Sequence, residues 1–267
     1  MRKSIEYQGT RVHYSVEGDG RVLLFLHGYL ESSAIWEEFT GRFTDRYKVI
    51  CVDIPGHGAS GILGPVHEME EMARAAGAVL DAEQVKKVVV FGHSMGGYVT
   101  MEFLHLFPEK TAGYCLFHST CFADNDEKKL NRDREISLVM CGKKMQIIHT
   151  NIPKGFAEKN LNRLAPWVNR SKQIAAGSPD EGIVALLQGM KSRQDHTELF
   201  RKTSPLPLLI WGRRDNYIGA EVFEKLRNIA PEASVVILDE SGHMGFIEEP
   251  ENAYRGITRY LASLEYK

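Results

Sequence analysis

Six short apolar runs, rich in β-branched residues, are spaced along the chain. They are VLLFL (22–26), VICVD (49–53), VVVF (88–91), YCLF (114–117), PLLIW (207–211) and VVIL (235–238). In these runs the apolar residues follow one another instead of alternating with polar residues. Continuous apolar strands are typical of a sheet that is covered on both faces, and such sheets are usually parallel. We therefore expect one buried and mostly parallel sheet.

Helical periodicity separates these runs. It is found in residues 69–80, 97–107, 221–229 and 250–264. Pro108 ends the second pattern, and Pro250 fits the first turn of the last one. The alternation of strands and helices predicts an α/β fold. At the N-terminus, IEY (5–7) and RVHYSVE (11–17) flank a Gln-Gly-Thr turn, and we expect them to form an edge hairpin antiparallel to the other strands.

Residues 120–204 break this alternation because they contain no convincing strand. Ile183, Leu186, Leu187 and Met190 lie at helical spacing within this segment. The segment is expected to form a helical cap, inserted into a core made of residues 1–119 and 205–267. The alternative is a helical domain with no role at the functional site.

Composition and charge narrow the class of protein. The 267 residues are 43% hydrophobic and 25% charged, which is typical of a globular protein. The net charge of −2 and the lack of a basic stripe disfavour a nucleic-acid partner. No apolar run approaches the length of a membrane span, and no signal peptide is recognisable, so no membrane partner is expected. The oligomeric state stays open.

The cysteines carry no metal or disulfide signature. There is no CxxC pair and no Cys or His cluster at zinc spacing among Cys51, Cys115, Cys121 and Cys141. We expect free thiols, a cytoplasmic location, and no metal or cofactor.

The strongest chemical signal is the sequence Gly92-His93-Ser94-Met95-Gly96, which follows the apolar run 88–91 and precedes a helical pattern. A G-x-S-x-G motif between a strand and a helix is the context of a nucleophile elbow. Its glycines let the strand and the helix approach each other closely. The helix N-terminus places free N–H groups near a developing oxyanion. Ser94 is therefore the predicted nucleophile.

With this motif the chain resembles the α/β-hydrolase superfamily, in the small form that carries a helical cap. The resemblance implies an eight-stranded, mostly parallel sheet flanked by helices. FLHGYLESSAIW (25–36) is similar to the family's His-Gly oxyanion loop. It implies that the backbone N–H groups of Tyr29 and Met95 form the oxyanion hole. The sequence from Asp53 to Ser60 resembles the family's D-x-x-G-x-G-x-S loop, which we interpret as structural support.

A serine nucleophile needs a base, and the base needs a carboxylate to orient it. In this fold the chain order is Ser, then Asp or Glu, then His. Asp215, in Trp-Gly-Arg-Arg-Asp, follows the apolar run 207–211, and His243, in Ser-Gly-His, follows the run 235–238. We predict the triad Ser94, Asp215 and His243. Weaker candidates for the acid are Asp124, Asp239 and Glu240.

The expected activity is a serine carboxylesterase that cleaves small or medium acyl esters of small molecules. An apolar pocket is expected, lined by Tyr29, Leu30, Met95, Phe122 and Trp167. The cations Lys128, Lys129, Arg132 and Arg134 are interpreted as a solvated helix face rather than a site for an anionic substrate. The open alternatives are carbon–carbon bond hydrolysis, thioester hydrolysis and perhydrolysis on the same triad, or a ligand-binding receptor built on a hydrolase scaffold.

Overall fold

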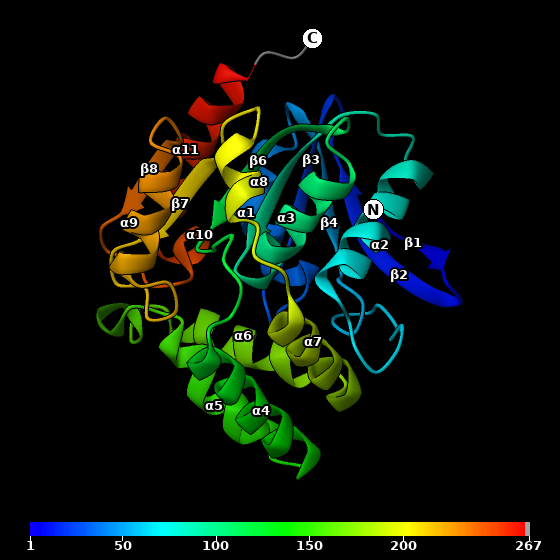
Figure 1. The fold of residues 1–267 in the computed structure, drawn as a ribbon, viewed down its shortest axis with the longest axis vertical. Coiled ribbons are helices and arrows are strands. Elements are labelled where there is room, and N and C mark those ends of the chain that lie inside the picture. The colour runs from blue at the N-terminus through cyan, green and yellow to red at the C-terminus, as the bar shows by residue number, and fades with distance from the viewer. Residues whose placement is uncertain (265–267) are drawn as a thin grey trace.

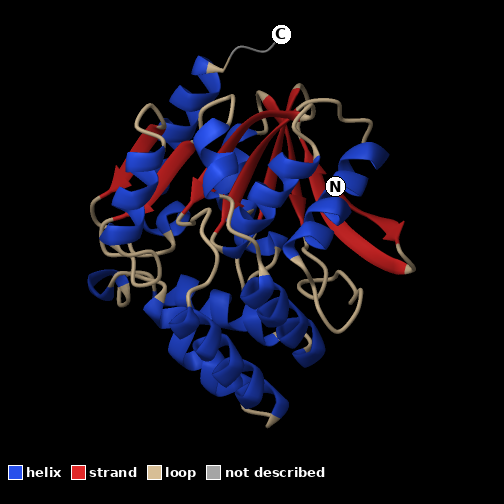
Figure 2. Ribbon diagram, in the orientation of Figure 1, coloured by secondary structure: helices blue, strands red, loops and turns tan. Residues whose placement is uncertain are grey.

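A single twisted sheet forms the centre of the molecule in the computed structural model, which describes residues 1–264 (Figure 2). Its eight strands have the order β1-β2-β4-β3-β5-β6-β7-β8. The strands are β1 (Arg2–Tyr7), β2 (Thr10–Glu17), β3 (Arg21–Leu26), β4 (Tyr47–Val52), β5 (Val88–His93), β6 (Thr111–Phe117), β7 (Leu208–Gly212) and β8 (Ser234–Leu238). All six predicted apolar strands are confirmed.

The pairing of the strands also follows the prediction. β1 and β2 form an antiparallel edge hairpin, and β2 pairs antiparallel with β4. From β4 to β8 every neighbouring pair is parallel. The carboxyl ends of these parallel strands therefore meet at one edge of the sheet, where the loops after them can bring side chains together.

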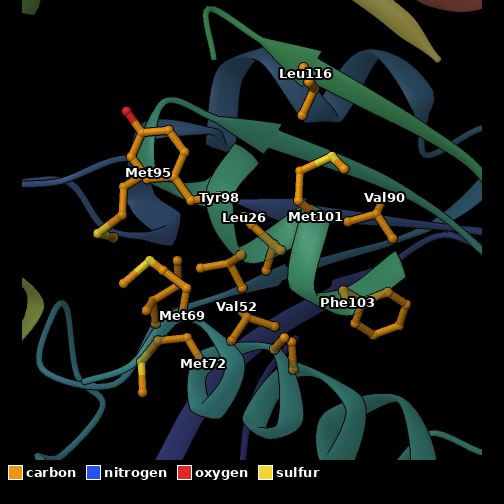
Figure 3. Packing of buried hydrophobic residues seen from close by; sticks show 14 of the residues in the cluster. Leu26, Val52, Met69, Met72, Val90, Met95, Tyr98, Met101, Phe103 and Leu116 are labelled. Carbon is orange, nitrogen blue, oxygen red and sulfur yellow. The ribbon is translucent and has the colours of Figure 1, made fainter. Parts of the chain in front are cut away.

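Helices cover both faces of the sheet, because alternate strand residues point to opposite sides. Leu24 and Val90 pack on one face with α2 (Met69–Ala82), α3 (Met95–Leu106), α8 (Thr197–Lys202) and α9 (Ala220–Ile229). Phe25 and Phe91 pack on the other face with α1 (Glu37–Thr40), α10 (Gly245–Glu248) and α11 (Pro250–Ser263). Figure 3 shows Met69 and Met72 of α2 beside Leu26 and Val52 in the first of these layers.

Four further helices form a separate layer, drawn below the sheet in Figure 1. They are α4 (Asp126–Met140), α5 (Lys144–Lys154), α6 (Ala165–Ala176) and α7 (Asp180–Ser192). Within the segment 120–204, α8 differs from these four. Its Phe200 is buried with Trp211 and Phe223 in the cluster on the first face of the sheet. The layer over the strand ends is thus made by α4–α7, and we call it the helical layer.

Close backbone contacts attach the helical layer to the core. The His67 N–H donates a hydrogen bond of 3.0 Å to the Ala185 carbonyl of α7. A Cβ at Gly189 would lie 1.7 Å from the His67 carbonyl oxygen, so only glycine allows this approach. At the other side, the buried Glu248 carboxylate accepts from the N–H groups of Ala157 and Gly242. These contacts tie α7 and the 155–160 loop to the core.

None of the helices within residues 1–264 combines the length and the apolar character that crossing a lipid bilayer requires.

Candidate active site

The predicted catalytic residues all lie in loops at the carboxyl ends of parallel strands. Ser94 follows β5, Asp215 follows β7 and His243 follows β8. Ser94 and His243 line the same cavity, which the helical layer covers. Strands that are distant in sequence are thus responsible for bringing these side chains to one place.

Ser94 sits in the sharp turn between β5 and α3. Its backbone has φ 51° and ψ −115°, a conformation that residues with a Cβ rarely adopt. The turn needs close contact between its two arms, because a Cβ at Gly92 would lie 2.2 Å from the Gly96 carbonyl oxygen. This strained turn holds the half-buried Ser94 at the N-terminus of α3, where it faces the cavity.

His243 is oriented from two sides. Its Nδ1 donates to Asp215, with distances of 2.9 Å to Oδ2 and 3.0 Å to Oδ1. Its backbone N–H donates to the Gly155 carbonyl at 2.7 Å. An Nδ1–H that is held by a carboxylate leaves Nε2 free to accept a proton, which is the tautomer a general base needs.

Asp215 is itself held as a carboxylate. Its Oδ1 accepts from the backbone N–H groups of Tyr217 and Ile218, at 2.8 and 3.0 Å. Burial alone would raise the pKa of Asp215. The charge of His243 and the hydrogen bonds from His118 and His243 outweigh burial and hold this pKa well below its usual range. Asp215 is therefore held in its ionised form.

A second histidine contacts the same carboxylate. His118 Nδ1 lies 3.1 Å from Asp215 Oδ2, and its Nε2 accepts from the Gly245 N–H at 3.1 Å. Because Nε2 accepts, the proton is on Nδ1, which donates to Asp215; the 3.2 Å contact from the Gly212 N–H to Nδ1 is then not a hydrogen bond. Burial lowers the pKa of His118 to about 4, against the opposing effect of Asp215. His118 is therefore a neutral donor that helps to orient the acid.

His118, Asp215 and His243 also form a possible metal-ligating group, the one found among residues 1–264. Their ligand atoms lie within 4.8 Å of one another. Internal hydrogen bonds already engage both nitrogens of His118 and both oxygens of Asp215. The hydrogen-bonded geometry fits an oriented base better than a metal centre.

The weaker candidates for the acid lie elsewhere. Asp124 is engaged by Arg132 and Arg193. Asp239 pairs with Arg213, and Glu240 pairs with Arg214. Asp215 is the carboxylate in contact with His243.

The predicted oxyanion donors are two backbone N–H groups that are not engaged within the described part of the protein. Within residues 1–264, the backbone N–H groups of Tyr29 and Met95 have no hydrogen-bond acceptor in the protein. The neighbouring N–H groups are engaged, since Leu30 donates to His57 Nε2 at 3.0 Å and Gly28 donates to Glu31 Oε2 at 2.6 Å. The loop therefore leaves the Tyr29 N–H available while it holds the groups on either side.

The loop that contains Tyr29 is held by two histidines and an aspartate, which bond to backbone N–H groups and have a structural role. His27 Nε2 accepts from the Ile54 N–H, and burial lowers the pKa of His27. Burial also lowers the pKa of His57 to about 3. The Asp53 carboxylate accepts from the N–H groups of Ser33 and Ala59, as expected for a residue that caps local backbone groups.

Sequence reasoning missed a buried ion pair beneath the site. His93 Nδ1 lies 3.0 Å from Glu31 Oε2, and His93 Nε2 lies 2.9 Å from the His243 carbonyl oxygen. Both partners are acceptors, so both ring nitrogens must carry a proton, and His93 is an imidazolium. Burial lowers the pKa of His93, but Glu31 and the His243 carbonyl outweigh it and raise that pKa. No motif in the sequence signals this pairing.

The cavity has a volume of about 540 Å³, and its wall is more polar than predicted. Tyr29 and Leu30 line it as expected, whereas Met95, Phe122 and Trp167 do not. Met95 packs into the apolar cluster of Figure 3, and the Trp167 ring stacks with Arg170. Polar side chains of the helical layer take their place, among them Lys128, Asn131, Arg132, Arg134, Glu135 and Asn151. Three of the four cations assigned to a solvated face thus line the cavity.

Comparison with known proteins agrees with this geometry. Residues 21–250 match the alpha/beta hydrolase fold family, and the chain belongs to that family. It is similar to a pimeloyl-[acyl-carrier protein] methyl ester esterase of Vibrio vulnificus, at 26% identity over 91% of this chain and 95% of the relative. A thermophilic esterase from Thermogutta terrifontis has the same fold, with a TM-score of 0.92, 26% identity and 98% coverage of both chains. A putative non-heme haloperoxidase of Mycobacterium phage D29 matches at 36% identity over 40% of this chain and 39% of its own. The protein is an alpha/beta hydrolase with esterase-like relatives.

Proposed function

We propose that the protein is a serine carboxylesterase that works through an acyl-enzyme on Ser94. The observation that carries this proposal is the Asp215–His243 pair, which faces the cavity that Ser94 lines. The esterases among the relatives support the same chemistry. Small-molecule esters are the proposed substrates.

In the proposed reaction, His243 Nε2 takes the proton of Ser94 Oγ as that oxygen attacks the ester carbonyl carbon. The N–H groups of Tyr29 and Met95 then stabilise the tetrahedral oxyanion. The bond from the carbonyl carbon to the alcohol oxygen breaks, and His243 returns its proton to the leaving alcohol. Water repeats the sequence, with His243 as base, and releases the acid and Ser94.

Asp215 and His118 prepare this sequence without contacting the substrate. Asp215 stabilises the imidazolium that forms on His243, and His118 donates to the same carboxylate. Both hydrogen bonds are buried, where an effective dielectric lower than that of water strengthens them. The base is thus pre-oriented before the substrate enters.

We propose that the helical layer, α4–α7 of the segment 120–204, forms the cap of this enzyme, on the core predicted as residues 1–119 and 205–267. The helices α4 and α5 supply much of the cavity wall, which supports a role in substrate selection. The four cysteines are free, and three are buried, which supports a reducing, cytoplasmic location.

The test is hydrolysis of p-nitrophenyl esters from acetate to decanoate by the wild type and by Ser94→Ala. We expect Ser94→Ala to lose at least about 10⁴-fold in kcat. The matched control is Ser137→Ala, which removes an exposed hydroxyl on α4. Wild-type protein that reacts with a fluorophosphonate at Ser94 but hydrolyses no ester would contradict the esterase proposal while keeping the nucleophile.

A further inference from the structure

Two polar atoms in the wall of the cavity have no hydrogen-bond partner. They are the Tyr29 hydroxyl oxygen and Glu135 Oε2, and both are buried. Tyr29 and Glu135 line the cavity together with Ser94 and His243. Burying a polar atom without a partner is unfavourable, so such atoms call for an explanation.

The two groups are complementary in chemistry. Burial raises the pKa of Tyr29 well above its usual value, and the charge of Glu135 and the closeness of that carboxylate to the hydroxyl raise it further. The Tyr29 hydroxyl therefore keeps its proton and is available as a donor. Glu135 Oε2 offers an acceptor, while the other oxygen of that carboxylate, Oε1, accepts from Asn151 Nδ2 at 2.9 Å.

The surrounding side chains hold this arrangement in place. Asn151 of α5 orients the Glu135 carboxylate, and the Asn151 carbonyl accepts from the Tyr217 hydroxyl at 2.9 Å. Arg132, one turn before Glu135 on α4, lines the same cavity and is held by Asp124 through an Nε–Oδ2 bond of 3.1 Å. Two helices and one core loop thus meet around Glu135, in the cavity wall that Tyr29 also lines.

The charges around this point decide which ligand group fits. A carboxylate placed here would face the negative charge of Glu135, and an ammonium group would face the positive charge of Arg132. A neutral group that accepts from Tyr29 and donates to Glu135 satisfies both free atoms without either repulsion. Hydroxyl and secondary amide groups have this property.

We infer that the substrate carries an uncharged hydroxyl or secondary amide, apart from its scissile ester, and that this group binds between the Tyr29 hydroxyl and Glu135 Oε2. The inference rests on the proposed esterase function and names its substrate class. Tyr29 then has two functions. Its backbone N–H faces the oxyanion, and its side-chain hydroxyl donates a hydrogen bond to the polar group of the substrate. Glu135 is a specificity-determining residue of the helical layer.

The test compares p-nitrophenyl esters of one acyl length that carry a hydroxyl, an acylamino group, a carboxylate, an ammonium group or no substituent at successive carbons. The measured quantity is the ratio of kcat/KM for each substituted ester to that of the plain ester. We expect the hydroxyl or the acylamino ester to exceed the plain ester by about tenfold at one carbon position. Whichever of the two shows this preference identifies the group.

Variants then assign the preference to the two side chains. Tyr29→Phe and Glu135→Met remove the donor and the acceptor, and each should bring the ratio close to one. Glu127→Met is the matched control, because Glu127 is another α4 carboxylate that lines the cavity but is exposed. Its ratio should stay at the wild-type value. Turnover of the plain ester by each variant shows that the variant is folded.

Three results would overturn the inference. They are a wild-type ratio near one at every position, a preference for the carboxylate or the ammonium ester, and a preference that survives both Tyr29→Phe and Glu135→Met. In each case the plain ester is still hydrolysed, so the esterase proposal stands. Failure of the wild type on every ester, plain and substituted, contradicts the esterase proposal itself.

Discussion

Glu31 Oε2 lies 3.0 Å from Nδ1 of His93, with the side chains 7% and 1% exposed. This pair joins three parts of the site. Glu31 also accepts from the Gly28 N–H in the oxyanion loop, His93 precedes Ser94 in the elbow, and the other ring nitrogen of His93 donates to the His243 carbonyl. The relative positions of the loop after β3, of Ser94 and of His243 therefore depend on one buried imidazolium.

The first prediction concerns the charge state of His93. In nitrogen-15 spectra, both ring nitrogens of His93 should remain protonated just above about pH 6.5, where an ordinary histidine is mostly neutral, because Glu31 and the His243 carbonyl accept from the ring and raise its pKa. A raised histidine pKa stabilises the fold below about pH 6.5, and this contribution is lost as the pH rises through the folded-state pKa. Glu31→Gln should make His93 neutral and lower kcat/KM about tenfold or more. A neutral His93 in the wild type would contradict the assignment.

The second prediction separates the two histidine contacts of Asp215. Asp215→Asn should lower kcat about 10⁴-fold, because an amide no longer selects the Nδ1–H tautomer of His243. His118→Asn removes one of the donors that orient Asp215 and leaves His243 in place, so we expect a smaller loss of about tenfold. Steady-state kinetics on one p-nitrophenyl ester measure both. Equal losses would show that His118 does more than position the acid.

The third prediction concerns the elbow. Gly92→Ala places a Cβ 2.2 Å from the Gly96 carbonyl oxygen and 2.2 Å from Thr100 Oγ1, so the backbone must move. We expect a loss of at least about 2 kcal/mol in the free energy of unfolding, measured by urea denaturation. Gly41→Ala is the control, since a Cβ there meets no atom within 4 Å. A Gly92→Ala protein of wild-type stability would contradict the close approach of strand and helix.

The fourth prediction is a loss of stability in mild acid. His57 and His118 are neutral in the fold, with pKa values lowered by burial to about 3 and about 4. Between about pH 6.5 and 4 the unfolded chain binds protons at these positions and the folded protein does not. As the pH is lowered through this range, the free energy of unfolding should decrease by up to about 1.4 kcal/mol per pH unit for each of the two histidines. His57→Gln should reduce that slope, whereas His149→Gln, at an exposed position, should not.

The fifth prediction concerns Glu83, which follows α2 and binds side chains of β1, β2 and β4. Its carboxylate accepts from Lys3, Tyr14 and Lys48 at 2.7–2.9 Å. Burial raises its pKa, but the hydrogen bonds from the two lysines and the tyrosine lower it to about 2. The ionised Glu83 therefore stabilises the fold above about pH 4.3, and this stabilisation is lost as the pH falls towards 2. Glu83→Gln should cost about 1–3 kcal/mol at pH 7; Glu224→Gln, on the exposed face of α9, should cost little.

The fold, and the placement of Ser94, Asp215 and His243 directly after strands, could be predicted because both depend on local sequence patterns. The apolar strands are continuous runs, and the elbow is a contiguous motif between a strand and a helix. Asp215 and His243 each follow a strand directly, so their placement needs only the parallel order of β5, β7 and β8.

The wall of the cavity was beyond sequence reasoning, because it depends on how the helical layer is rotated against the core. In α4 the apolar residues do not form one stripe. Ile136 and Val139 are buried, whereas Leu130 and Met140 are exposed. Arg132 and Glu135 therefore look like members of a solvated face, although they line the cavity. The pairing of Glu31 with His93 joins the loop after β3 to the last residue of β5, and no motif in the sequence predicts it.

The connection between β6 and β7 has a consequence for the order of folding. These strands are neighbours in the sheet, with Cys115 opposite Leu208, although residues 118–207 separate them in the chain. Contacts within the helical layer are shorter in sequence, such as those between α5 and α6. Pairing β6 with β7 requires closing the whole loop, and non-local parallel pairing is intrinsically slow. The end of the sheet formed by β7 and β8 should therefore gain amide-exchange protection after β3, β4 and β5, and Asp215 and His243, which follow these two strands, should reach their places last.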